Sequence, residues 1–216
     1  MKEIVEIQGI KLNINHPSIH GIKKFFYNKK YEHKEITILK NVLEKSDRVF
    51  EIGAGIGFIS AFCAKKVGNR VIGYEANPEM VKKIKETYKL NGVSPIVKQG
   101  ILLDKDGEIE FFLEKNFWSS STIKRSNSSK KIKIKTFNVN EEIKKFNPNF
   151  LIMDIEGGEK DLIPIIDFEN INKLLIEFHS DIIGEKVVSN SIKYLIEKGF
   201  CLDLYNSIKN VCYFRR

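Results

Sequence analysis

Apolar and polar positions follow two different periods that alternate along the chain from residue 47 onward. Short apolar runs, which are typical of buried strands, are separated by longer segments with apolar residues at helical spacing. One such helix has clear end signals, with Asn77 as N-cap, Pro78 at the first position and Gly92 beyond the end. This alternation predicts a parallel sheet with helices on both faces. The predicted strands are 48–53, 70–75, 94–100, 149–155 and 172–179, and the predicted helices are 57–68, 77–92, 138–146 and 185–199.

Two further segments alternate strictly between apolar and polar residues, which predicts extra half-buried strands. They lie at 108–115 and 131–137, so we expect additional strands inserted around 101–137. At the end of the chain, 200–206 and 210–216 predict a hairpin that closes the sheet. The predicted fold class is therefore α/β, with one main sheet and a β insertion.

Length and composition favour one globular domain. The 216 residues suffice for a sizeable α/β core, and 42% are hydrophobic and 30% charged. We expect residues 1–46 to form a strand and helix extension packed on a domain at 47–216. No apolar stretch resembles a membrane span or a signal peptide. The cysteines share no metal-ligand spacing, which favours reduced thiols and a cytoplasmic location; they are Cys63, Cys201 and Cys212.

The first predicted strand ends in the sequence EIGAGIG, residues 51–57. Glycines there allow a tight turn and a close approach of the backbone to a ligand. A nicotinamide-binding turn has the pattern G-x-G-x-x-G, whereas this one is G-x-G-x-G and has Glu51 two residues before its first glycine. A carboxylate is a poor neighbour for a pyrophosphate but a good partner for an amino group. The pattern therefore predicts S-adenosylmethionine (SAM), which carries an ammonium group and no phosphate.

The ends of the next two strands complete the predicted cofactor site. Glu75 follows Gly57 by 18 residues, near the offset of an acid that binds ribose hydroxyls. Gly100 and Ile101 end the third strand, where an adenine edge is expected. The predicted cofactor-binding residues are Glu51, Gly53, Ala54, Gly55, Gly57, Glu75, Ala76, Asn77, Gly100, Ile101 and Asp154.

Carboxylates follow the fourth predicted strand in the sequence LIMDIEGGEKDLI, residues 151–163. Because this strand lies beside the first in such a sheet, we expect Asp154 next to the sulfonium of SAM. Glu156 points the same way if the strand continues, and Glu177 and His179 share one face of the fifth strand. A hydroxyl acceptor needs a general base or a metal to lower its pKa, and the usual histidine pKa near 6.5 suits His179 for base work.

Each of these side chains also has an ordinary structural interpretation. Asp154 could cap the following helix, and Glu156 could be a first-turn acid favoured by the helix dipole. Glu177 could be a structural hydrogen-bond acceptor, and His179 a solvated residue at a strand end. The same four side chains offer donors for a divalent cation. No zinc-type spacing supports a metal, so a divalent metal is not favoured and no metal ligand is predicted.

The chain resembles the FkbM family of SAM-dependent methyltransferases over about residues 31–179. The resemblance rests on EIGAGIG, GYEANPE, WSSST, LIMDIEGGEKDLI and LLIEFH, and its most specific part is the D-[IV]-E-G-[AG]-E pattern after the fourth strand. It implies a Rossmann-like, seven-stranded, mostly parallel sheet whose last strand is antiparallel. It also implies methyl transfer, most often to a hydroxyl oxygen of a saccharide or natural product. Pro164 departs from the family, in which a helix usually continues at this point.

The site residues predicted from these arguments fall into two groups. The predicted catalytic residues are Asp154, Glu156 and His179. The predicted substrate contacts are Trp118, Ser119, Glu156, Glu177 and His179, with Trp118 on a loop that covers the acceptor.

Net charge leaves two other functions open. The formal charge of +8 permits binding to nucleic acid, but we find no added RNA-binding module. We therefore expect a small-molecule or saccharide acceptor, no nucleic acid and no membrane insertion, and a homodimer stays open. The alternatives are an RNA or protein methyltransferase and a non-catalytic SAM-binding domain.

Overall fold

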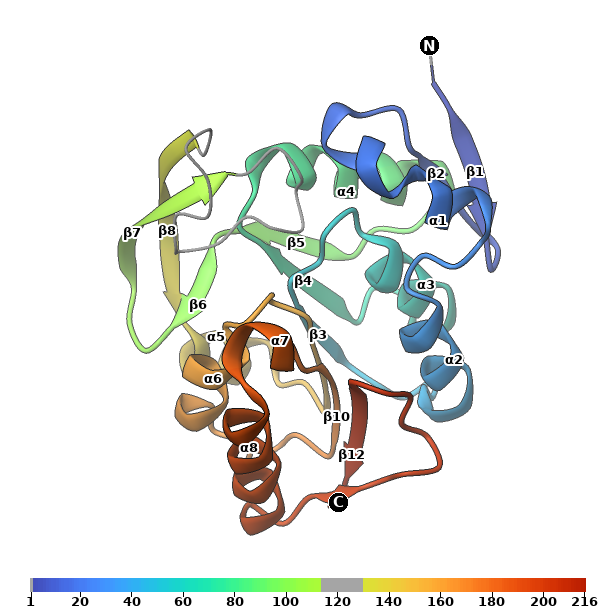
Figure 1. Ribbon diagram of the computed structural model, residues 1–216. Coiled ribbons are helices and arrows are strands. Elements are labelled where there is room, and N and C mark those ends of the chain that lie inside the picture. Colours follow the sequence, from blue (N-terminus) through green and yellow to red (C-terminus); the bar gives the residue numbers. More distant parts are fainter. Residues whose placement is uncertain (1, 114–129) are drawn as a thin grey trace.

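The computed structural model describes residues 2–113 and 130–216, and its centre is a seven-stranded sheet (Figure 1). The strands are β3 (Val49–Ile52), β4 (Val71–Glu75), β5 (Ile96–Gln99), β9 (Phe150–Met153), β10 (Lys173–Glu177), β11 (Cys201–Leu202) and β12 (Val211–Arg215). Their order across the sheet is β11-β12-β10-β9-β3-β4-β5. Strands β10 to β5 run parallel, whereas β12 is antiparallel to both of its neighbours. The predicted seven-stranded α/β sheet with an antiparallel last strand is confirmed.

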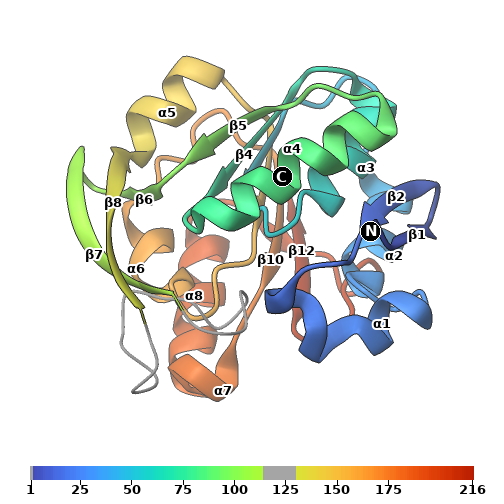
Figure 2. The same ribbon diagram turned by 90° about the horizontal axis from the view of Figure 1, so that it is seen from above.

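Helices cover both faces of this sheet, as predicted from the alternating pattern (Figures 1 and 2). Along β3, Val49 belongs to the core cluster that contains Phe58, whereas Phe50 belongs to the one that contains Leu195. This division follows from the period of two along a strand. The helices after β3 are α3 (Phe58–Val67), α4 (Pro78–Asn91), α5 (Val139–Phe146), α6 (Glu159–Leu162), α7 (Ser180–Ile183) and α8 (Glu185–Glu197), and a 3₁₀ helix, η3, spans Ile163–Ile165.

A second sheet of three strands lies beyond β5, at the edge of the main sheet (Figure 2). It contains β6 (Ile101–Leu103), β7 (Gly107–Leu113) and β8 (Lys130–Asn138). Strand β8 is the middle strand, parallel to β6 and antiparallel to β7. The extra strands expected around 101–137 are therefore present, and they form a separate small sheet.

The N-terminal region packs against α4 and the core. It contains β1 (Ile4–Ile7), β2 (Ile10–Asn13), the 3₁₀ helix η1 (Pro17–Ile22), α1 (Lys23–Tyr27) and α2 (His33–Val42). The Asn91 side chain accepts a hydrogen bond from the amide of Lys11 and donates one to its carbonyl, at 2.9 and 2.8 Å. Leu12 and Phe26 share a buried cluster with Phe58. These contacts agree with a packed extension, while a boundary at residue 46 stays a prediction.

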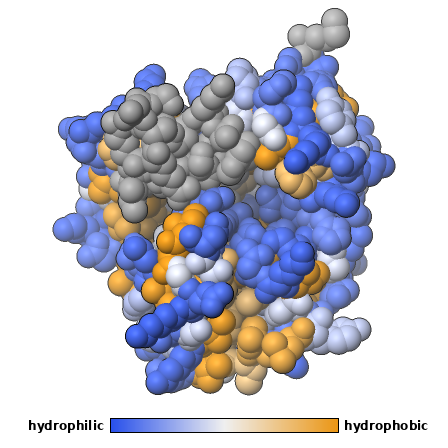
Figure 3. Space-filling model, viewed as in Figure 1, coloured by the Kyte–Doolittle hydropathy of each residue, from blue (hydrophilic) through white to orange (hydrophobic). Residues whose placement is uncertain are grey.

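The surface in the view of Figure 3 is mostly hydrophilic, with hydrophobic side chains in small groups. Among the described residues, no helix combines the length and the apolar character needed to cross a membrane.

Candidate active site

A glycine turn at the end of β3 brings β3 and β9 together. Gly53 has a φ of +89°, and a Cβ atom at this position would lie 1.7 Å from the carbonyl oxygen of Asp154. Any larger residue would therefore force the two strand ends apart. Because Ile52 pairs with Met153 in the parallel register, Asp154 emerges next to this turn. The expectation that Asp154 lies next to the sulfonium of SAM stays a prediction, with which this position agrees.

Two acids flank the glycine turn, the buried Glu51 and the half-buried Glu75. Glu51 is 3% exposed, and its Oε2 atom has no hydrogen-bond partner among the described residues. Burial raises the pKa of Glu51 to about 8. Burial also raises the pKa of Glu75, to about 7, although backbone N–H groups donate to its carboxylate and lower it. Those donors are Asn77 at 2.7 Å, Gly55 at 2.8 Å and Ala76.

A cavity of about 470 Å³ lies beyond the carboxyl ends of β3, β4 and β9. A cavity of this size can hold a cofactor and part of an acceptor. The cofactor residues predicted from the sequence that line it are Glu51, Gly53, Ala54, Gly55, Glu75, Ala76, Gly100, Ile101 and Asp154.

Two of the predicted cofactor residues lie outside the cavity lining and have structural roles. Gly57 precedes α3 with a φ of +78°, and a Cβ atom there would lie 3.0 Å from the Ile84 side chain. Asn77 caps α4, because its side-chain oxygen accepts from the amide of Glu79 at 3.0 Å. We therefore expect these two residues to act on the cofactor only through the shape of the loops.

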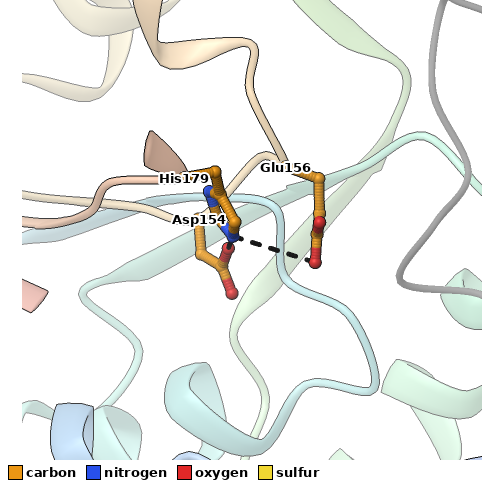
Figure 4. A group of neighbouring side chains, drawn as sticks. All are labelled: Asp154, Glu156 and His179. Carbon is orange, nitrogen blue, oxygen red and sulfur yellow. Dashed lines mark ion pairs between the residues drawn. The ribbon is translucent and has the colours of Figure 1, made fainter. Parts of the chain in front are cut away.

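Asp154, Glu156 and His179 form a cluster at the cavity wall (Figure 4). His179 Nε2 lies 3.5 Å from Asp154 Oδ1 and 3.8 Å from Glu156 Oε1. Asp154 and Glu156 line the cavity, whereas His179 lies behind them, outside the cavity lining. Strand β9 ends at Met153, so the condition under which Glu156 would follow strand geometry is not met. Glu156 instead turns with a φ of +52°, which still brings its carboxylate to the cluster.

His179 is held from its other side by a buried acid. Its Nδ1 atom lies 2.6 Å from Glu159 Oε1, and the Glu159 side chain is 0% exposed. Burial lowers the pKa of His179, but the hydrogen bond to Glu159 and the charge of Asp154 outweigh this and raise the pKa to about 9. The usual pKa near 6.5, on which the base argument rested, therefore does not apply in this arrangement.

Glu177 is engaged with side chains from distant parts of the chain. Its Oε1 atom lies 2.6 Å from the ammonium nitrogen of Lys34 and accepts a hydrogen bond from Asn210 at 2.9 Å. Glu177 lines the cavity, and its charge raises the pKa of Asp154 after the larger effect of burial. Two other predicted substrate contacts, Trp118 and Ser119, lie outside the described residues.

The N-terminal region adds acids to the cavity that sequence reasoning missed. Glu32 and Glu35 both line it from the start of α2. Glu35 is 4% exposed, and burial followed by the charge of Glu177 raises its pKa to about 7. Glu32 has a φ of +47°, an uncommon conformation for this residue type that often marks functional sites. No local pattern in the sequence places α2 at the edge of the sheet, so these two acids could not be assigned to the site from the sequence.

The cavity lining is strongly acidic. Lys160 is the only cationic residue among the described residues that line it, against eight acids. Such a wall repels phosphate and attracts cations, which suits the ammonium and sulfonium of SAM. The buried, unpaired Oε2 of Glu51 is likewise a site for a hydrogen-bond donor with positive charge. The acids are Glu32, Glu35, Glu51, Glu75, Asp154, Glu156, Asp161 and Glu177.

Comparison with protein-family models gives one match. Residues 51–200 match the model described as the methyltransferase FkbM domain. This segment includes the glycine turn, the Asp154–Glu156 exit and His179.

Comparisons with individual proteins give partial relatives and similar folds. The chain is 43% identical over 94 residues to a protein named as a protein N5-glutamine methyltransferase from Methanocaldococcus jannaschii, and the match covers 42% of each chain. A transferase structure from Pyrococcus horikoshii has a TM-score of 0.56 at 15% identity, with 99% of this chain and 71% of that chain covered. Trm5b from Pyrococcus abyssi has a TM-score of 0.52 at 17% identity, covering 99% and 55%. At these identities the two structures show a shared fold.

Proposed function

Because the chain belongs to the FkbM family of methyltransferases and uses SAM as cofactor, we propose that it methylates a hydroxyl group of a saccharide or another small natural product. The observation that carries this proposal is the cluster of Asp154, Glu156 and His179 beside the glycine turn at Gly53. A hydroxyl is a weak nucleophile near neutral pH, and a cluster of this composition can hold it and accept its proton.

We assign the donor side to the ends of β3, β4 and β5. SAM carries its methyl group on a sulfonium. When the methyl group is transferred, the sulfonium becomes a neutral thioether, which is the leaving group. Glu51 is suited to the ammonium of the methionyl group, because its unpaired Oε2 faces no other donor among the described residues. Glu75 keeps a free acceptor position for a ribose hydroxyl, since a carboxylate offers about four and the amides of Gly55, Ala76 and Asn77 occupy one each. Gly100 and Ile101 border the expected adenine position.

The acceptor side follows from the position of the cluster. Asp154 and Glu156 line the cavity next to the turn that contacts the donor. An acceptor hydroxyl placed there would be aligned for in-line attack on the methyl group, and alignment alone supplies a large share of the rate. His179 and the buried Glu159 hold the two carboxylates in place from behind.

Methylation of a protein glutamine is the second candidate, because the partial relative from Methanocaldococcus jannaschii carries that name. Against it, the exit from β9 is Asp154–Ile155–Glu156–Gly157 and lacks the Asn-Pro-Pro-Tyr sequence associated with amide and amine methylation. RNA methylation is less well supported by the site. The net charge is +8, yet the cavity lining is acidic and would repel a phosphate backbone.

The test is transfer of the labelled methyl group of SAM to three acceptor pools: hydroxylated small molecules, proteins with exposed glutamines, and RNA. We expect label in the first pool, and turnover at least about a hundredfold lower in Asp154→Asn and His179→Ala. Glu169→Gln, which changes an exposed acid outside the cavity, is the control and should keep full turnover. Label in protein glutamine or RNA alone would overturn the hydroxyl proposal. Full turnover in both site variants would overturn the site assignment.

A further inference from the structure

The Asp154, Glu156 and His179 cluster has the dimensions of a metal site. Each residue offers one ligand atom, and these atoms lie within 4.8 Å of one another. In a site with metal–ligand distances near 2.1 Å, adjacent ligands lie about 3 Å apart and opposite ligands about 4 Å apart. The separations from His179 Nε2, 3.5 and 3.8 Å, are already close to these values. Small side-chain rotations would therefore bring all three atoms to a common cation.

One ligand atom of the cluster lacks any partner that would satisfy it. Asp154 Oδ1 is buried and accepts no hydrogen bond from the described residues, although 30% of the Asp154 side chain as a whole is exposed. The same atom is the one that faces His179 Nε2. A buried carboxylate oxygen without a donor is costly, and a cation between the two side chains would satisfy it.

His179 is oriented in the way that metal-bound histidines usually are. Its Nδ1 atom contacts Glu159 Oε1 at 2.6 Å, and Glu159 is fully buried. When Nδ1 donates to a carboxylate, the lone pair of a neutral imidazole is fixed on Nε2, which here faces Asp154 and Glu156. Dashed lines in Figure 4 mark the direction of Nε2 toward both carboxylates.

Charge around the cluster also favours a cation. Among the described residues, the cavity lining has eight acids and one lysine, and the nearby Lys34 forms its ion pair with Glu177. Two carboxylates and one neutral imidazole would balance the charge of a divalent ion. Calcium prefers six to eight oxygen ligands, whereas manganese and other first-row ions accept both imidazole and carboxylate.

We propose that Asp154, Glu156 and His179 bind a divalent first-row metal ion, with Glu159 as the positioning residue behind His179. The remaining coordination positions face the cavity, because Asp154 and Glu156 line it. There the ion would contact the acceptor hydroxyl and lower its pKa. This role rests on the proposed function, whereas the binding of the metal does not.

The test uses the full chain and Mn²⁺ alone, without SAM or acceptor. Free Mn²⁺ gives a six-line electron paramagnetic resonance signal that decreases on binding, so titration yields the dissociation constant and the number of sites. We expect one site per chain. Electron spin echo modulation of the bound ion should show coupling to one imidazole nitrogen, since His179 is the only predicted nitrogen ligand.

Variants separate metal binding from folding and from activity. Asp154→Asn, Glu156→Gln and His179→Ala should each weaken Mn²⁺ binding by about tenfold or more, and His179→Ala should remove the nitrogen coupling. Glu169→Gln should bind as wild type does. Thermal unfolding of every variant shows which are folded, and the partly exposed Glu156 provides a variant that disturbs the core little.

The outcomes are distinct from those of the methyl-transfer test. Binding of Mn²⁺ that the three variants leave unchanged, or that shows no nitrogen coupling, would overturn the metal site. So would the absence of binding at millimolar Mn²⁺, which would leave a hydrogen-bonded ion-pair network. If Mn²⁺ binds as expected while label appears only in protein or RNA, the metal-site proposal is supported and the hydroxyl-acceptor proposal is overturned.

Discussion

Glu51 is a buried acid whose ionisation the protein resists unless a cation is present. It is 3% exposed, and burial raises its pKa from 4.5 to about 8. Between these two values the native state binds more protons than the unfolded chain. The free energy of unfolding therefore falls as the pH rises from about 4.5 to 8, and the loss is complete above that range. A bound ammonium group would remove this cost.

Glu51→Gln should accordingly stabilise the protein without SAM while weakening SAM binding. At pH 8 we expect the free energy of unfolding to rise by about 1–3 kcal/mol, and the gain should vanish near pH 4.5. Urea unfolding at several pH values measures this, and calorimetric titration measures SAM affinity, with Glu169→Gln as control. An unchanged pH slope in the variant would contradict the assignment, as would wild-type affinity for SAM.

His179 shows how neighbours change the role of a residue. Three acids, Asp154, Glu156 and Glu159, face its ring. They raise its pKa to about 9 against the effect of burial, so the imidazole favours a cationic or metal-bound state over that of a free base. The place of His179 at the active site stays a proposal, but its predicted role changes from a free base to a cationic or metal-bound imidazole.

Backbone conformation, close contacts and hydrogen bonds at the strand ends determine the paths of the loops after β3, β4 and β9. Gly157 follows Glu156 with a φ of +99°, and a Cβ atom there would lie 2.7 Å from the side chain of Ile182 in α7. The exit from β9 is thus pressed against α7, which positions Glu156. After β4, the cap formed by Asn77 starts α4 and leaves the Glu75 carboxylate facing the glycine turn.

Asn77→Ala distinguishes a helix cap from a cofactor ligand. Loss of the cap should lower the free energy of unfolding by about 1 kcal/mol. SAM affinity should change little, because Asn77 is outside the cavity lining and its backbone amide, which donates to Glu75, is kept. Thermal unfolding and calorimetry measure the two effects, and Asn77→Ser should restore stability. A large loss of SAM affinity with unchanged stability would instead show a direct contact.

At the scale of the molecule, the N-terminal region belongs to both the core and the site. Leu12 and Phe26 are 0% and 1% exposed within the cluster that contains Phe58. The same region supplies Glu32 and Glu35 to the cavity and Lys34 to Glu177. Residues 1–46 therefore contribute to the buried core and to the wall of the cavity.

A chain that consists of residues 47–216 alone should fail to fold cooperatively. The truncation removes side chains that pack in the core and so exposes the face of the core that β2, α1 and α2 cover. In the full chain, Leu12→Ala should lower the free energy of unfolding by about 2–5 kcal/mol, because it leaves a cavity. Circular dichroism during heating measures both. A sharp transition for 47–216 near the wild-type temperature would show that the N-terminal region is dispensable for folding.

The sequence by itself determined the order of strands and helices, the glycine turn and the acids at strand ends. These depend on local periods and on turn and cap chemistry, as Gly53, Asn77 and Asp154 show. Parallel strands end at one edge of the sheet, so residues such as Glu51 and Glu75 could be placed near one another before the structure was known.

Only the tertiary structure decided the surroundings of those residues, which means their neighbours, burial and pKa values. Glu35 reaches the cavity through the packing of α2, which no local period encodes. Glu156 arrives by a left-handed turn and not by strand geometry. The raised pKa of His179 depends on distances to acids 20 to 25 residues away in the chain. Burial and charge act through space, so the sequence located this site while the fold set its chemistry.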